Sequence, residues 1–190
     1  MEKSTMLSNK MKISVEQEKL ADFSPEHARF YVRYSSFVFR ALKKPSFQKF
    51  LSWMLKKEKI AEGAVREVDV KVLPSRKKNG QGIAGKCDPA QGRIRIYPKT
   101  IKFCQMFRQK FGRQTFSAYA GNRARAAIIH ELLHLKYTEN ERTVRKLSEE
   151  YFCIFAHEQS EGNSCVHYIF KMIFRAKSYK GNFQKALNNS

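Results

Sequence analysis

Cysteine is scarce in this sequence of 190 residues, and so are long apolar runs and acidic side chains. The four cysteines, Cys87, Cys104, Cys153 and Cys165, stand far apart and form no CxxC pair, which argues against a zinc site built from thiolates. No apolar run approaches the length of a membrane span, and the N-terminus lacks the apolar core of a signal peptide. We therefore expect a cytoplasmic protein with reduced thiols and no membrane span.

The shortage of acidic residues gives the chain an unusual charge. Against 17 Asp and Glu stand 37 Lys and Arg, for a formal net charge of +20. The excess is uneven, because residues 63–117 hold 13 basic and three acidic residues whereas residues 118–160 hold six of each. A basic surface indicates nucleic acid, an anionic membrane face or an acidic protein substrate as partner. A generally cationic soluble protein is the alternative. We expect nucleic-acid contact, if any, at Arg76, Lys77, Lys78, Arg93 and Arg95.

Hydrophobic spacing predicts helices on both sides of a short region of strands. Ser24-Pro25-Glu26 has the chemistry of a helix start, and Lys44-Pro45-Ser46 ends that helix and begins a second one. The alternation around Val68 and Val70 predicts a strand, and a hairpin is predicted over residues 83–97. Further helices are predicted over residues 100–111, 117–137, 138–155 and 165–176. Gly112–Gln114 is expected to separate the first two of these helices.

The most informative segment is His130-Glu131-Leu132-Leu133-His134, an HExxH pattern. On an α-helix, residues i and i+4 project from one face, so both imidazoles can reach one tetrahedral Zn²⁺. Glu131 can hydrogen-bond a metal-held water and accept its proton. The flanking residues are apolar on every side, so we expect a buried helix whose two histidines and carboxylate need a partner. The alternative is an ordinary helix that happens to carry two histidines and an acid.

This motif lies in a longer stretch that resembles a known family. Residues 128–151, IIHELLHLKYTENERTVRKLSEEY, resemble the small metallopeptidases of the YgjP and SprT-like type, and also the archaeal minimal gluzincins. Residues 82–98 are similar to the family's strand beside the substrate cleft. The resemblance covers roughly residues 65–155. It implies an α+β, zincin-like fold, with a small, mostly antiparallel sheet, an HExxH active-site helix and a backing helix.

Combined with the element pattern, the resemblance predicts four parts of the chain. These are a polar N-terminal segment (1–23), a helical hairpin (24–60), a zincin-like metallopeptidase domain (61–176) and a polar tail (177–190). The resemblance further implies Zn²⁺ as cofactor and a protein or peptide as substrate. The SprT-like type suggests that the substrate is protein associated with nucleic acid.

The third zinc ligand is left open by the motif. In an ungapped alignment the family's third histidine falls on Asn140, a poor zinc ligand, with Glu139 and Glu141 on either side. Glu141 begins the next predicted helix and can turn back toward the histidines, although it can instead complete a capping box with Thr138. Glu150 lies beside the inward stripe of that helix and is the second candidate. The remaining candidates are Glu139, Glu149, His157 and Glu158.

The sequence therefore predicts a zinc-dependent metallopeptidase that hydrolyses peptide bonds by attack of a zinc-bound water. His130, His134 and Glu141 are the expected metal ligands and Glu131 is the expected general base. Two other classes stay open. One is a basic nucleic-acid-binding module with a structural or inactive metal site. The other is a metal-dependent hydrolase of a non-peptide bond.

Overall fold

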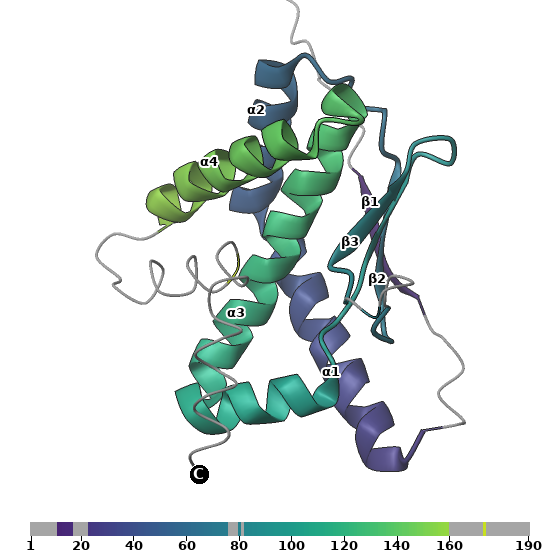
Figure 1. Cartoon of the computed structure of the whole chain (residues 1–190), viewed down its shortest axis with the longest axis vertical. Helices are drawn as coiled ribbons and strands as arrows, with labels where there is room; N and C mark the ends of the chain where they lie inside the picture. The colour runs from purple at the N-terminus through teal and green to yellow at the C-terminus, as the bar shows by residue number, and fades with distance from the viewer. Residues whose placement is uncertain (1–10, 17–22, 76–79, 81, 160–172, 174–190) are drawn as a thin grey trace, which may run out of the picture.

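The computed structural model describes residues 11–16, 23–75, 80, 82–159 and 173 of the chain (Figure 1). Its elements in chain order are β1 (Lys12–Glu16), α1 (Pro25–Leu42), α2 (Pro45–Glu58), β2 (Glu67–Lys71), β3 (Gly85–Asp88), β4 (Arg93–Ile96), α3 (Ile101–Tyr137) and α4 (Glu141–Gln159). Helices α1 and α3 pack on one face of the four-stranded sheet, and α2 and α4 pack against α3 farther from it. The fold is therefore α+β, as expected.

The sheet differs from the expected one because most of its pairings are parallel. Its strand order is β1-β2-β4-β3, with β1–β2 and β2–β4 parallel and only β3–β4 antiparallel. The expectation of a mostly antiparallel sheet is wrong. The physical reason lies in the connections. The helical crossover through α1 and α2 makes β2 parallel to β1, and β4, which reverses direction from β3 at the hairpin, lies between β3 and β2 and therefore runs parallel to β2. Only the short turn from Asp88 to Arg93 forms the predicted hairpin.

Strand β1 lies inside residues 1–23, which we expected to be a polar N-terminal segment. Its residues pair with β2 over five positions, from Lys12 opposite Glu67 to Glu16 opposite Lys71. Ile13 is buried against the core, whereas Ser14 points to the outer face of the sheet. A short strand with one polar face contains too few apolar residues to be recognised in a sequence. It forms because its backbone pairs with β2.

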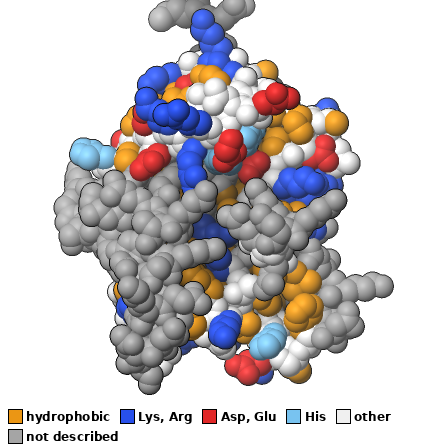
Figure 2. Space-filling view, in the orientation of Figure 1, with side chains coloured by type: hydrophobic (Ala, Val, Ile, Leu, Met, Phe, Trp, Pro, Cys, Tyr) orange, Lys and Arg blue, Asp and Glu red, His pale blue; other side chains and the backbone are white. Residues whose placement is uncertain are grey.

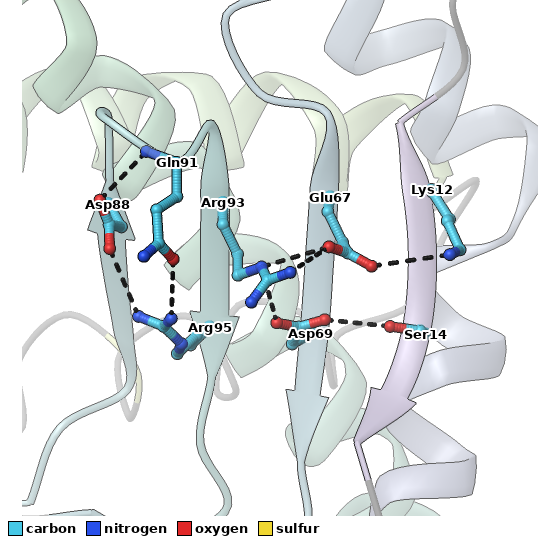
Figure 3. A network of polar contacts seen from close by, with 8 residues as sticks. All are labelled: Lys12, Ser14, Glu67, Asp69, Asp88, Gln91, Arg93 and Arg95. Carbon is cyan, nitrogen blue, oxygen red and sulfur yellow. Dashed lines mark hydrogen bonds and ion pairs between the residues drawn. The ribbon is translucent and has the colours of Figure 1, made fainter.

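The outer face of the sheet carries a network of ion pairs (Figure 3). Arg93 bonds Glu67 at 2.6 Å and Asp69 at 3.3 Å, and Asp69 also accepts a hydrogen bond from Ser14 at 3.0 Å. Arg95 pairs with Asp88 at 3.8 Å and donates to Gln91 at 3.2 Å. The two strand arginines of our expected polyanion surface are thus engaged by acids within the sheet. The other three, at positions 76–78, lie outside the described residues.

Helix α3 is the long element that carries the motif. It bends at Gly112, whose φ of 79° and ψ of 168° are not helical, so the predicted break is present as a kink. Beyond the kink, Gly121 lets α1 approach closely, because a Cβ there would lie 2.9 Å from the Cβ of Ala41. Ile128, Ile129 and Leu133 are fully buried. The motif helix is therefore embedded in the core, as expected.

A buried carboxylate ties the end of α2 to both helices of the motif region. Glu58 accepts hydrogen bonds from Lys136 Nζ and Tyr137 OH, each at 2.8 Å, and from Tyr151 OH. Burial alone would raise the pKa of Glu58, but the hydrogen bonds from Lys136, Tyr151 and Tyr137 outweigh it and lower that pKa. Because Lys136 and Tyr137 end α3 and Tyr151 lies on α4, this network fixes how the two helices meet.

The remaining expectations concern the C-terminal part of the chain, one cysteine and the absence of a membrane span. The predicted helix over 165–176 and the polar tail lie outside the described residues, apart from Ile173. Cys153 stands in an apolar run of the sequence, which is typical of a core residue, but it is exposed on α4. Among the helices that the structure describes, none is long and apolar enough to cross a membrane.

Candidate metal centre

The two motif histidines present their outer ring nitrogens to each other. His130 Nε2 and His134 Nε2 are 3.1 Å apart, and the two rings stand nearly perpendicular. This follows from their spacing on α3, which puts them one turn apart on the same face. Both side chains are about one quarter exposed, at 27% and 24%, so they lie at the edge of the core and not inside it.

The third member of the group comes from the start of α4. Glu141 Oε2 lies 3.4 Å from His134 Nε2 and 3.7 Å from His130 Nε2. Glu141 is the first residue of α4, and the side chain of Asn140 caps that helix by accepting from Thr143 N at 3.0 Å. The capping role that we weighed for Glu141 with Thr138 is therefore taken by Asn140, and the carboxylate turns back toward α3.

The three ligand atoms fit a tetrahedral metal ion. Ligands about 2.0–2.1 Å from a tetrahedral zinc stand about 3.4 Å from one another. The distances among His130 Nε2, His134 Nε2 and Glu141 Oε2 are 3.1, 3.4 and 3.7 Å. Within the described part of the chain, these residues are also the one group of histidines, cysteines and carboxylates gathered closely enough to hold a metal. The group leaves one tetrahedral position for water or substrate.

The contacts of the two Nδ1 atoms indicate which ring nitrogens of His130 and His134 carry a proton. His134 Nδ1 lies 3.3 Å from Thr138 O, and because a carbonyl only accepts, this nitrogen donates. His130 Nδ1 lies 3.3 Å from Ser148 Oγ, whose own hydrogen goes to Val144 O at 2.6 Å, so this nitrogen donates as well. In neutral imidazoles both Nε2 atoms then carry lone pairs, which repel at 3.1 Å. A cation between them and Glu141 removes the conflict.

The other candidates for third ligand do not reach the histidines. Glu150 pairs instead with Lys146, at 3.7 Å along α4. Glu139, His157 and Glu158 are exposed, and Glu149 is half-buried. None of these five residues belongs to a metal-binding group among the described residues.

The expected general base lies against strand β3. Glu131 Oε2 accepts a hydrogen bond from Cys87 N at 2.8 Å. A Cβ on Gly85 would come within 2.9 Å of Glu131 Cγ, so only glycine lets the strand approach this closely. Burial, followed by the charges of Glu131 and Asp88, raises the pKa of the Cys87 thiol to about 11, which makes this cysteine a poor nucleophile.

A pocket of about 240 Å³ opens beside this group. His130, Glu131 and Glu141 lie on its wall together with three basic residues, Lys99, Arg123 and Arg145. Arg123 is buried and donates to Tyr97 O at 2.6 Å and to Ile83 O at 3.3 Å, at the two ends of the β3–β4 hairpin. It thereby holds the hairpin, and with it the wall of the pocket, against α3.

Sequence reasoning missed three residues that shape this site. Ser148 had a usable signal, since it follows Glu141 by two helical turns and therefore lies on the same face of α4. Gly85 and Arg123 had none, because their roles depend on how closely the hairpin packs on α3. Helix spacing reports which residues share a face of one helix, but it does not report which strand will lie against that face.

Comparison with known proteins adds no family to this description: no protein-family model, no curated protein and no solved structure matches the chain. What is established is a His-His-Glu group, formed by the long helix α3 and the start of α4, that can hold a metal ion.

Proposed function

We propose that this protein is a zinc-dependent peptidase with His130, His134 and Glu141 as metal ligands and Glu131 as general base. The observation that carries the proposal is the convergence of three ligand atoms, 3.1–3.7 Å apart, beside a carboxylate and an open pocket. Two imidazole nitrogens, one carboxylate oxygen and one open position make up a common ligand set of catalytic zinc. The resemblance of residues 128–151 to small metallopeptidases supports the same proposal.

The residues around the metal group have the roles that hydrolysis requires. Bound zinc would polarise the scissile carbonyl and acidify a water molecule. Glu131 would accept a proton from the attacking water and pass it to the leaving amine, so its carboxylate would be restored at the end of the cycle. The Cys87 amide, which donates to Glu131 Oε2 at 2.8 Å, keeps the carboxylate oriented beside the histidines. Ser148 and the Thr138 carbonyl hold the two imidazole rings.

The position of β3 favours an extended peptide as substrate. This strand is at the edge of the sheet, and the Cys87 amide on its outer side points at Glu131. The edge that does not pair with β4 therefore faces the motif helix, next to the pocket. Because the Cys87 amide is already bonded to Glu131, an extended peptide would use the other backbone groups of this edge, which would place its peptide bonds beside the metal group.

The metal site is tested by analysis of bound zinc. His134→Ala should lose most of the zinc that the wild-type protein carries, because a site with two ligands binds zinc far more weakly than a site with three. His157→Ala is the matched control, since His157 is an exposed histidine on α4 outside the group. Equal zinc content in both variants and the wild type would refute the site.

The peptidase activity is tested separately on a mixed peptide library with cleavage followed by mass spectrometry. Glu131→Gln should keep the zinc and the fold but lose about two to four orders of magnitude in turnover, since only the proton acceptor is removed. Glu139→Gln, an exposed carboxylate nearby, is the control. A zinc-loaded wild-type protein that cleaves no peptide would exclude the peptidase and leave the structural metal site or the non-peptide hydrolase. Wild-type turnover in Glu131→Gln would refute the mechanism.

A further inference from the structure

A second and larger hollow lies between α1 and α3, on both sides of the kink at Gly112. Its volume is about 650 Å³, within the range of pockets that enclose a small ligand. It shares no lining residue with the pocket beside the metal group. Four arginines and one glutamate lie on its wall: Arg29, Arg33, Arg108, Arg113 and Glu26. Figure 1 shows the elements that these residues come from, α1 and the two limbs of α3 before and after its bend.

Among the described residues, the arginines of this hollow lack the acidic partners that arginines on the sheet have. On the sheet, Arg93 and Arg95 are both paired with carboxylates. In the described part of the chain, none of the four arginines of the hollow forms an ion pair. Arg29 and Arg33 also stand four residues apart on α1, where like charges repel. A concentration of positive charge of this kind is stabilised by a bound anion.

Four aromatic rings and Ser117 form the rest of the wall. Tyr34 and Phe116 are buried with their ring centroids 6.0 Å apart, and Phe30 and Phe37 are half-buried at the surface. The guanidinium of Arg40, which does not line the hollow, lies 5.1 Å from the Phe37 ring centroid. Arginine forks suit phosphate oxygens, and aromatic faces suit the flat surface of a nucleobase. The hollow offers both chemistries together.

From these observations we infer that the hollow between α1 and α3 binds single-stranded nucleic acid, with about one or two nucleotides seated among the arginines and Phe37. A duplex keeps its bases stacked inside and presents only backbone, whereas a single strand can place an unstacked base in a hollow. Lys and Arg side chains are spread over the face that Figure 2 shows. The net charge of +20 attracts a polyanion far more strongly than a single phosphate. This inference does not rest on the proposed peptidase activity.

The test compares two double variants that remove the same charge. Arg33→Gln with Arg113→Gln removes two arginines of the hollow, and Lys44→Gln with Arg142→Gln removes two exposed basic residues outside it. Binding of a fluorescein-labelled oligothymidine is followed by anisotropy over a range of salt concentrations. Each lost phosphate contact on a single strand reduces the slope of log affinity against log salt by about 0.7. We expect the hollow variant to lose about 1.4 from that slope, and the control variant to keep it.

The base seat is tested with Phe37→Leu, which keeps an apolar side chain of similar size. Affinity for oligothymidine should fall at least about fivefold, while affinity for an abasic strand of equal length should not change. Equal slopes in the two double variants, or no binding of the wild type at low salt, would overturn the inference. The inference would also be overturned if thymidine monophosphate, at equal phosphate concentration, fully displaced the oligothymidine. The same holds if the hollow variant lost binding only to phosphatidylserine vesicles and kept its affinity for oligothymidine. An unchanged affinity of Phe37→Leu would overturn the base seat.

Discussion

Ser148 offers a sharp test of the metal site because it touches a proposed ligand without being one. Its hydroxyl is buried, donates to Val144 O at 2.6 Å and accepts from His130 Nδ1 at 3.3 Å. Ser148→Ala removes the acceptor that holds the His130 ring and sets which nitrogen faces Glu141. No ligand atom is lost, so any change in metal affinity reports on orientation alone.

The magnitude follows from this geometry. Loss of a residue that hydrogen-bonds a metal ligand typically weakens metal binding by 10- to 100-fold, and the 3.3 Å distance to a neutral hydroxyl places this contact at the weak end. We therefore expect about a tenfold loss of zinc affinity, or about 1.4 kcal/mol. The stability loss should be about 1 kcal/mol, as for one hydrogen bond.

Competition with a chromogenic zinc chelator measures the affinity, and urea denaturation measures the stability. Ser35→Ala is the matched control, because Ser35 is equally buried on α1 and its hydroxyl donates to Val32 O at 2.9 Å. Both variants should lose similar stability, but only Ser148→Ala should lose zinc affinity. If the two variants bind zinc equally well, the assignment of the His130 tautomer and its role in the site are wrong.

Three other changes test the packing around the site. Gly85→Ala should displace the Glu131 side chain and lower peptide turnover at least about tenfold at unchanged zinc content. Gly63→Ala is the control, because a Cβ there would meet no atom within 4 Å, and it should keep its turnover. Equal turnover in the two variants would contradict the contact between Gly85 and Glu131. Gly121→Ala should destabilise the fold by about 1–2 kcal/mol in urea denaturation, because the clash with Ala41 costs more than the gain in helix propensity. A stabilised variant would show that α1 and α3 can move apart at this point. Glu58→Gln should cost about 1–3 kcal/mol at pH 7. Because the pKa of Glu58 is lowered by folding, its contribution is present above the unfolded pKa and lost as the pH falls through the folded one, so the difference from wild type should shrink at pH 3.

The sequence alone determined the features that depend on neighbours along the chain. The HExxH spacing placed His130 and His134 on one face of a helix, the apolar residues around them buried that helix, and Gly112 interrupted it. The turn between Asp88 and Arg93 gave the hairpin. These features are readable because helix period and turn chemistry act over a few residues.

Only the tertiary structure decided what depends on contacts between distant segments. The parallel pairing of β1 with β2 follows from the crossover through α1 and α2, and that of β2 with β4 follows from the place of the β3–β4 hairpin in the sheet. No local pattern in the sequence predicts either pairing. The choice between Glu141 and Glu150 depended on how α4 crosses α3, which the Glu58 network fixes and the capping by Asn140 permits. The same holds for the ion pairs. The carboxylates that pair with Arg93 lie on the neighbouring strand β2, so a count of charges along the chain does not predict the pairing.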